Sequence, residues 1–364
     1  MAHSTIDARE RSARGNRYGP TAARSHDRRP PRPASTTIDI HSHVAIPEAS
    51  AYAAQYVDLS DIPIARFSTD ATRAINRRQD EDRTLTMTDI DDRLAVLDAM
   101  ELDMQLVAPP PPQCFATLPA EHAAKAIAMV NHGVAAFVGQ RPDRFLGLGT
   151  VTFQEPGQAV ADLVEVIGPL GLKGVMILTS IKGEEIAAPR FEPFWKKAEE
   201  LGALVMIHSN GFSGGERFTP YYFSNVIGNP LDTAVALHFL IFNGVLERMP
   251  DLKILAVHGG GLLPAYSGRI DHAWGAREDT NAGLPKPPTE YLKKVYFDSV
   301  VFTPHQLEYL VRMYGADHIV MGTDYPYDMA EYDPVGHVMA ASGLTEDEKA
   351  KVAGGTAKAL LGLA

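Results

Sequence analysis

From Thr37 onward, short apolar runs rich in β-branched residues alternate with longer segments whose apolar residues recur at helical spacing. The longer segments, such as 89–100, 121–138 and 304–315, are typical of amphipathic helices. The expected strands cover residues 37–41, 104–109, 145–151, 174–178, 203–208, 253–258, 295–300 and 318–324. Because a helix follows each of these eight strands, the pattern predicts an α/β fold with a parallel sheet, closed into a (β/α)8 TIM barrel.

Two segments are longer than simple connections between strands and helices. Residues 45–88 follow the first strand and are polar and irregular, whereas residues 209–230 follow the fifth strand and carry several aromatic side chains. Long loops at the carboxyl ends of barrel strands form the active-site rim. We therefore expect both inserts on the C-terminal face of the barrel. The aromatic residues could also pack against another subunit, and the two roles are compatible.

The first 37 residues differ from the rest of the chain in charge. They contain eight arginines and three acidic residues, a local charge of +5 that leaves −16 on the remainder of a chain of net charge −11. With almost no large apolar residues, residues 1–37 are expected to be a disordered extension, and residues 38–364 to form the barrel domain. The extension lacks the apolar core of a secretory signal. Its Arg- and Ser-rich composition overlaps with organellar transit peptides, but it shows no amphipathic apolar face, so a dispensable tail is the preferred interpretation.

Composition narrows the class of partner. The acidic net charge argues against nucleic acid as the main partner. The apolar runs are far shorter than a bilayer span, and Cys114 is the only cysteine, which excludes an intrachain disulfide. No GxGxxG motif follows the first strand, which argues against a dinucleotide-binding fold. We therefore expect a soluble, cytoplasmic protein that acts on a small molecule.

Residues with metal-ligand chemistry fall at the carboxyl ends of four expected strands. His41 and His43 end the first strand, His208 the fifth, His258 the sixth and Asp324 the eighth. In a closed parallel barrel these ends converge on one mouth, and the i, i+2 spacing turns His41 and His43 to the same face. Three of these imidazoles together with the carboxylate suit Zn²⁺, with Mn²⁺, Fe²⁺ or Co²⁺ as alternatives. The fourth strand does not end in the lysine that bridges two ions in two-metal barrels, so we expect one ion per chain.

His258 is followed by three glycines. Glycines beside the imidazole remove side chains from the mouth and would let substrate or water approach closely. That environment suits a general acid or base better than a fourth histidine ligand. A glycine-rich turn that merely starts a helix would explain the glycines but not the histidine.

At these positions the sequence resembles the amidohydrolase superfamily, and within it the branch of aminocarboxymuconate-semialdehyde decarboxylase and its relatives that act on aromatic acids. The similar segments include IDIHSH at 38–43, the block 244–274 around HGGG, and MGTDYPYD at 321–328. The resemblance implies His41, His43, His208 and Asp324 as metal ligands. It also implies His258 as the catalytic base, with Asp324 counted beside it among the catalytic residues, and a homodimer.

The same resemblance implies where the substrate binds. In this family the arginine of the GR pair, here Arg269, reaches across the dimer to the substrate carboxylate in the partner's active site. Its planar guanidinium suits a carboxylate because it donates two parallel hydrogen bonds. Arg83 is the nearest match to a second substrate arginine between the first strand and its helix. After His208 the chain reads HSNGF where the family has an HPWDM-like segment, which assigns Phe212 to an altered wall beside the metal.

The leading functional hypothesis is metal-dependent, non-oxidative decarboxylation of an unsaturated or aromatic carboxylic acid, with His258 handling the proton. The alternative is hydrolysis of an amide, a lactone or a C–C bond by a metal-activated water. The same mouth suits either reaction, so the fold and the ligands do not discriminate between them. A non-enzymatic metal-binding scaffold is disfavoured because the ligands and the base are all present.

Overall fold

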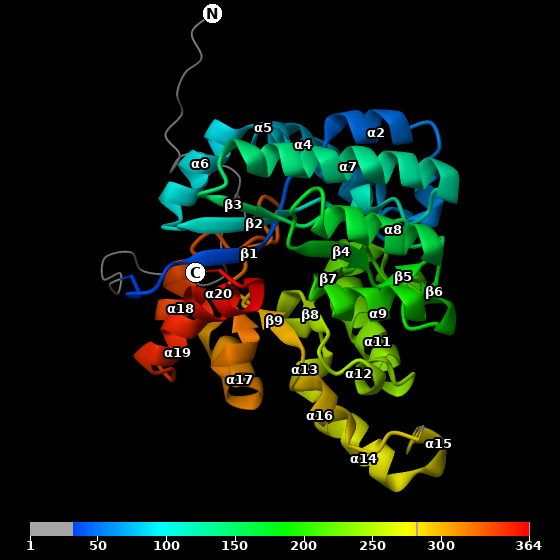
Figure 1. The fold of residues 1–364 in the computed structure, drawn as a ribbon, viewed down its shortest axis with the longest axis vertical. Helices are drawn as coiled ribbons and strands as arrows, with labels where there is room; N and C mark the ends of the chain where they lie inside the picture. Colours follow the sequence, from blue (N-terminus) through cyan, green and yellow to red (C-terminus); the bar gives the residue numbers. More distant parts are fainter. Residues whose placement is uncertain (1–31, 282, 364) are drawn as a thin grey trace, which may run out of the picture.

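The computed structural model describes residues 32–281 and 283–363. Parallel strands lie at its centre and helices surround them (Figure 1). The barrel strands are β1 (Ile38–His43), β2 (Met104–Ala108), β3 (Phe145–Gly147), β4 (Gly174–Leu178), β7 (Leu204–His208), β8 (Lys253–Ala256), β9 (Tyr296–Asp298) and β10 (Ile319–Val320). A small antiparallel hairpin of β5 (Ser180–Ile181) and β6 (Glu184–Glu185) follows β4.

Two parallel sheets, β1-β2-β3 and β10-β9-β8-β7-β4, close on each other. Single bridges join them at both seams, Ser42 with Tyr325 and Gly149 with Val175. At the first seam the His43 N–H donates to the Tyr325 carbonyl at 2.8 Å. The eight strands therefore form a closed barrel, and the predicted (β/α)8 fold is confirmed.

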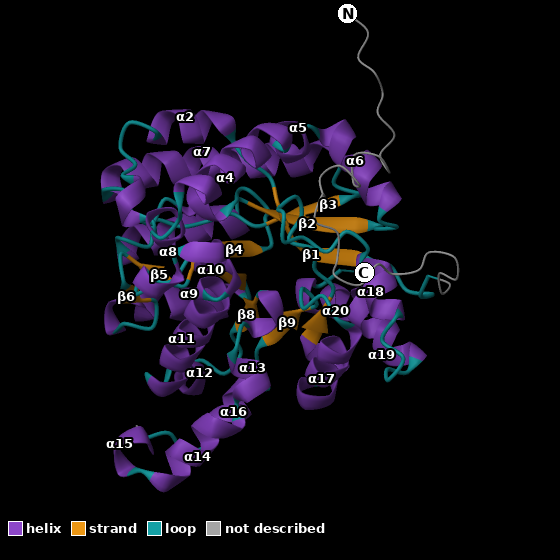
Figure 2. Ribbon diagram, turned by 180° about the vertical axis from the view of Figure 1, so that it is seen from behind, coloured by secondary structure: helices purple, strands orange, loops and turns teal. Residues whose placement is uncertain are grey.

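Helices pack around the barrel (Figures 1 and 2). Their bounds are α2 (Pro47–Ala53), α3 (Pro63–Arg66), α4 (Asp70–Asp82), α5 (Thr84–Thr88), α6 (Ile90–Ala99), α7 (Ala120–Gln140), α8 (Pro156–Ile167), α9 (Glu192–Leu201), α10 (Phe223–Val226), α11 (Gly228–Phe242), α12 (Val245–Arg248), α13 (Leu263–Tyr266), α14 (Gly268–Ala276), α15 (Glu278–Asn281), α16 (Pro288–Leu292), α17 (Pro304–Tyr314), α18 (Pro334–Met339), α19 (Glu346–Ala350) and α20 (Thr356–Leu361). In both views α14 and α15 form an arm that extends away from the barrel.

The barrel strands are buried on both faces, since helices cover the outside and side chains fill the interior. Every residue of β1, β4 and β7 is buried. The last strand is shorter than predicted. After β10 the pairing with β1 becomes irregular: the Thr323 N–H and hydroxyl donate to the Asp39 carboxylate at 3.0 and 2.7 Å, and the Asp324 N–H donates to the His41 carbonyl at 2.8 Å. These contacts hold the chain against β1.

The insert 45–88 is more regular than its composition predicts. Most of 45–88 is helical, in α2 to α5, and α4 begins where the Thr69 hydroxyl accepts a hydrogen bond from the Thr72 N–H at 3.1 Å. The insert 209–230 forms short helical turns and α10. The Ile64 N–H donates to the Asn210 carbonyl at 3.1 Å, so the two inserts contact each other above the strand ends.

Residues 32–37 are the described part of the expected extension, and they pack on the barrel. Arg32 forms an ion pair with Asp103, whose carboxylate also accepts from the Thr37 N–H at 2.8 Å. The Ser35 hydroxyl donates to the Ala350 carbonyl at 3.1 Å. The packed chain therefore begins several residues before the predicted boundary. Residues 1–31, where disorder is expected, lie outside the described residues.

One helical stretch, Pro220–Phe242, is long and apolar enough to cross a membrane by length and composition alone. Half of its most apolar window is buried inside the fold. Most of α11 faces the barrel, with Ala236, Leu237, Leu240 and Ile241 nearly inaccessible. Its apolar character is thus accounted for by burial in the core.

Candidate metal centre and active site

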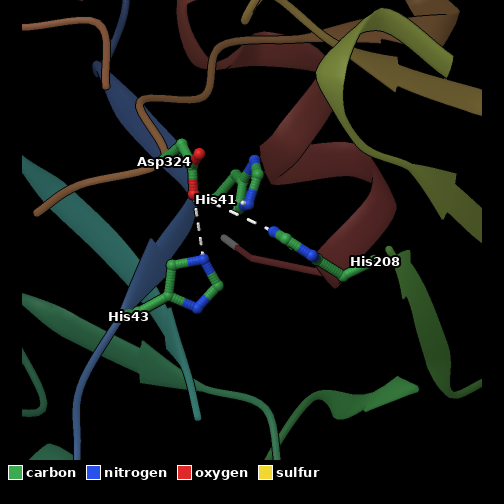
Figure 3. Close-up of side chains that lie close together, drawn as sticks. All are labelled: His41, His43, His208 and Asp324. Atoms are coloured by element: carbon green, nitrogen blue, oxygen red, sulfur yellow. Dashed lines mark hydrogen bonds and ion pairs between the residues drawn. The ribbon is translucent and has the colours of Figure 1, made fainter. Parts of the chain in front are cut away.

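The strand ends bring four predicted ligands together. His41 and His43 lie on β1, His208 ends β7, and Asp324 follows β10. All four are buried, and one ligand atom from each lies within 4.8 Å of the others. Figure 3 shows the four side chains converging. A His/Asp metal-binding site is therefore present at the mouth of the barrel.

Each imidazole of this cluster is oriented by a contact at its Nδ1 atom. The Nδ1 of His41 lies 2.7 Å from Asp298 Oδ2, that of His43 lies 3.0 Å from the Pro109 carbonyl, and that of His208 lies 2.7 Å from the Ser209 carbonyl. Oxygen acceptors require a hydrogen on Nδ1, which leaves the Nε2 lone pairs as metal donors. The buried Nε2 atoms of His41 and His208 have no hydrogen-bond partner among the described residues.

These unpartnered nitrogens indicate that the cluster fits a divalent ion. Leaving a buried polar atom unsatisfied is costly, and coordination to a metal would remove that cost. Burial lowers the pKa of His208 to about 3 and also lowers the pKa of His43. Both rings are therefore neutral near pH 7, the form that binds metals.

Asp324 faces two groups at once. Its Oδ1 lies 3.4, 3.1 and 3.9 Å from the Nε2 atoms of His41, His43 and His208, while its Oδ2 lies 3.4 Å from His258 Nε2. Burial opposes the charged form of Asp324, but the surrounding histidines outweigh it and hold the pKa well below its usual range. One ionised carboxylate thus joins the ligand cluster to His258.

His258 lies beside the cluster and not within it. Its side chain is 17% exposed, the largest exposure among the five predicted His and Asp groups, so substrate can reach it. The ring centroid lies 4.8 Å from that of His208, and the buried Nδ1 has no hydrogen-bond partner among the described residues. The role of His258 as an acid or base, and not as a fourth imidazole ligand, stays a prediction.

The glycines after His258 have a structural role that the sequence did not predict. His258 and the three following glycines all have positive φ, from 56° to 75°. A Cβ atom on Gly259 would lie 2.5 Å from Val301, and one on Gly261 would lie 2.2 Å from the Pro230 carbonyl. A left-handed turn packed against its neighbours therefore requires the glycines, whereas their predicted role in giving substrate access to His258 stays a prediction.

Asp298 is a functional candidate that the sequence reasoning missed. Its Oδ2 contacts His41, and its Oδ1 accepts from the Gly259 N–H at 2.7 Å. It thereby fixes both a predicted ligand and the turn that carries His258. The expected strand 295–300 has Asp298 in its interior, whereas β9 ends at Asp298, so the position of this carboxylate at a strand end is visible only in the structure.

Arg83 lies near the cluster, connected to it through Tyr327. The guanidinium carbon is 4.7 Å from the Tyr327 ring centroid, and that ring packs edge-on against His43 at 5.2 Å. Arg83 Nη2 pairs with Asp80 at 2.8 Å, but its buried Nε has no hydrogen-bond partner among the described residues. Tyr327 was not predicted, although it stands three residues after Asp324.

No ring contact, hydrogen bond or ion pair joins Phe212 or Arg269 to the cluster among the described residues. Phe212 is half-buried in the insert 209–230, where its ring lies 6.2 Å from that of Phe218. Arg269 is exposed at the start of α14, on the arm that extends away from the barrel (Figure 2). A Cβ on the neighbouring Gly268 would meet nothing within 4 Å.

Comparison with known proteins gives consistent matches over the barrel. A sequence model of the amidohydrolase family matches residues 38–363. The 2-amino-3-carboxymuconate-6-semialdehyde decarboxylase of Dictyostelium discoideum is 33% identical, over 76% of this chain and 77% of that protein. The γ-resorcylate decarboxylase of Rhizobium sp. is 25% identical, over 75% and 87%.

Solved structures share the fold. The 5-carboxyvanillate decarboxylase of Sphingomonas paucimobilis has a TM-score of 0.79 at 27% identity, covering 91% of this chain and all of that chain. A dihydroxybenzoic acid decarboxylase of Polaromonas, solved with manganese and the inhibitor 2-nitroresorcinol, has a TM-score of 0.75 at 22% identity, covering 90% and 97%. At that identity the second match supports the fold alone.

Proposed function

Because this chain belongs to the amidohydrolase family, as its sequence predicts, we propose that it is a metal-dependent enzyme that decarboxylates aromatic or unsaturated carboxylic acids without a redox step. One observation carries the proposal: Asp324 faces three buried imidazoles with one oxygen and His258 with the other. The relatives described above are decarboxylases, which favours this reaction over hydrolysis.

His41, His43 and His208, through Nε2, and Asp324, through a carboxylate oxygen, would hold one ion. Zn²⁺ is our first choice because nitrogen-rich sites with four protein ligands suit it, and the manganese in the Polaromonas enzyme makes Mn²⁺ the main rival. When bound, the ion polarises an oxygen of the substrate and stabilises negative charge that develops there.

His258 would move the proton. Decarboxylation breaks a C–C bond, CO₂ leaves, and the carbon that retains the electron pair must gain a proton. His258 reaches the mouth from the side of the cluster, and Asp324 Oδ2 holds its Nε2 in place. Asp324 is thus a metal ligand that also orients the acid or base.

Because the barrel is acidic, binding of the substrate carboxylate requires specific cationic side chains. Arg83, beside Tyr327, is the candidate within the chain. Arg269 is proposed to serve the active site of a second copy in a homodimer, and Phe212 to contribute to the wall of the mouth. Support for the dimer comes from large apolar side chains exposed next to Arg269, with Tyr266 69% and Leu262 49% exposed.

Isotope labelling tests the reaction. Protein loaded with Zn²⁺ or Mn²⁺ would be incubated with 2,6-dihydroxybenzoate or 5-carboxyvanillate in D₂O and, separately, in H₂¹⁸O. We expect CO₂ and one deuterium on the carbon that lost the carboxyl group, with His258→Asn as the metal-retaining control. A product that contains ¹⁸O and is formed without CO₂ would establish hydrolysis instead.

A further inference from the structure

A cavity of about 230 Å³ lies where β4 and β7 end, on the face of the barrel that carries the ligand cluster. Both inserts and the residues that follow β4 and β7 line it. Its polar lining includes Thr179 and Asp232 on the inside, with the exposed cations Arg66 and Lys182 also present. The proposed decarboxylation assigns no role to any of these side chains.

The cavity adjoins His208. Leu178, which lines it, is the β4 partner of His208 in the sheet. The next residue, Thr179, donates its N–H to the His208 carbonyl at 3.2 Å, and Asn210 lines the cavity two residues after His208. A ligand bound at the cluster would therefore have this cavity beside it.

Asp232 places a buried carboxylate in the lining. The residue is only 6% exposed, and its Oδ2 accepts a hydrogen bond from the Thr179 hydroxyl. Its Oδ1 has no hydrogen-bond donor among the described residues, and no described cation forms an ion pair with it. Burial raises the pKa of this carboxyl to about 7, because its charged form is poorly stabilised.

We propose that this cavity is a substrate subsite that takes a hydroxyl or amino substituent, which donates a hydrogen bond to Asp232 Oδ1. The inference rests on the proposed function in that the acid group of the same substrate occupies the mouth at the metal. The volume is larger than a hydroxyl or amino group needs, so the cavity would also take part of the ring that carries it. The ionised form of Asp232 accepts a hydrogen bond from such a donor and disfavours a second carboxylate at Oδ1.

Three variants isolate the acceptor. Thr179→Val with Asp232→Leu removes both partners of the internal hydrogen bond, so neither is left unsatisfied in the core. Thr179→Val alone keeps the carboxylate and is the matched control. Lys182→Met changes another lining side chain and leaves Asp232 intact.

The measurement is binding, not turnover. Isothermal titration calorimetry on zinc-loaded protein would compare 2,3-, 2,4- and 2,5-dihydroxybenzoate with the methyl ethers of their second hydroxyl, which cannot donate. For at least one position we expect the wild type to bind the hydroxy acid about 10- to 100-fold more tightly than its ether. Thr179→Val and Lys182→Met should keep this preference, and the double variant should reduce it to within about twofold.

If the double variant fails to fold, Asp232→Asn keeps the volume, loses the charge, and should reduce the preference by about fivefold. The proposal is overturned if the wild type shows no preference, if the variants lacking the carboxylate retain it, or if no acid binds to protein that holds one ion per chain. Asp232-dependent binding without CO₂ release would overturn only the proposed reaction. Decarboxylation with an Asp232-independent preference would overturn only the subsite.

Discussion

The metal-ligand cluster and the arm formed by α14 and α15 differ in whether a single chain supplies all the contacts that hold their side chains. Every imidazole of the cluster is buried and held at Nδ1 by an oxygen of the same chain. Arg269, on the arm, is exposed and forms no ion pair with any described residue. The barrel therefore preorganises the metal site by itself, whereas substrate recognition depends on peripheral segments and, in our proposal, on a second chain.

Removal of a metal ligand should have the largest effect, because it disrupts the metal site that one chain forms by itself. Asp324→Ala or His208→Ala leaves three of four ligands and an uncompensated polar cavity, so purified protein should lose its ion and its activity. Metal analysis by mass spectrometry measures the loss of the ion, and the wild type should contain one ion per chain. Two ions per chain would contradict the single-metal site.

His258→Ala should separate catalysis from metal binding. His258 contacts the Asp324 carboxylate and the rings of His41 and His208 but is not one of the four predicted ligands, so the variant should retain its ion while kcat falls by about 10²- to 10⁴-fold. Metal content and kcat would be measured on the same preparation. Loss of the ion together with activity would make His258 a ligand.

Arg269→Ala tests substrate recognition, which in our proposal needs a second chain. The variant should keep its fold and ion, since the side chain is exposed, but raise KM by about 10- to 100-fold, and Arg269→Lys should rescue little. Arg312, exposed on α17, supplies the control Arg312→Ala, with unchanged KM.

Mixing subunits sharpens this test. Arg269→Ala and His258→Ala chains should regain activity together, because one mouth of a hybrid dimer has both groups intact. If subunit exchange is demonstrated and the mixture stays inactive, Arg269 does not act on the partner's site.

Asp298→Asn should weaken metal binding without abolishing it. The amide no longer offers a charged acceptor to His41 Nδ1, and loss of such a contact reduces metal affinity about 10- to 100-fold. Asp162→Asn is the matched control, because Asp162 is also buried and accepts from a backbone N–H, but contacts no ligand. Competition with a chelator measures the metal affinity of both variants. Equal losses of affinity would show that Asp298 contributes only to general stability.

Truncation should have the smallest effect. Removal of residues 1–31 should leave Tm and kcat unchanged, because their composition offers little apolar surface to bury. Removal of 1–36 deletes the Arg32 and Ser35 contacts and should lower Tm by a few degrees at most. Differential scanning calorimetry distinguishes the two, and a large drop for the shorter deletion would show that residues 1–31 stabilise the barrel.

The barrel and its cluster could be predicted from sequence because both depend on local patterns. Strand-length apolar runs fix where the chain is buried, and a His or Asp directly after such a run must point into the mouth. His41, His43, His208 and Asp324 obey that rule and converge as predicted. The length of β10 did not follow, because Thr323 bonds to Asp39, 284 residues away.

Contacts between distant segments explain the other differences. Tyr327 lies between Arg83 and His43 only because an insert after β1 packs over the loop after β10, and no periodicity encodes that. The insert 45–88 was expected to be irregular because its helix α4 is strongly polar and buries none of its residues. The glycines after His258 suggested access, whereas their backbone conformation, visible only in three dimensions, requires them for packing.

The seam between β1 and the segment after β10 makes metal binding depend on the order in which the chain is synthesised. His43 and Asp324 are 281 residues apart, so the first ligands leave the ribosome long before the last. Until the carboxyl end arrives and pairs with β1, the nascent barrel has an open edge and no complete site. Capture of the ion would therefore be among the last events of folding, and an occupied site would indicate that the segment after β10 has paired with β1.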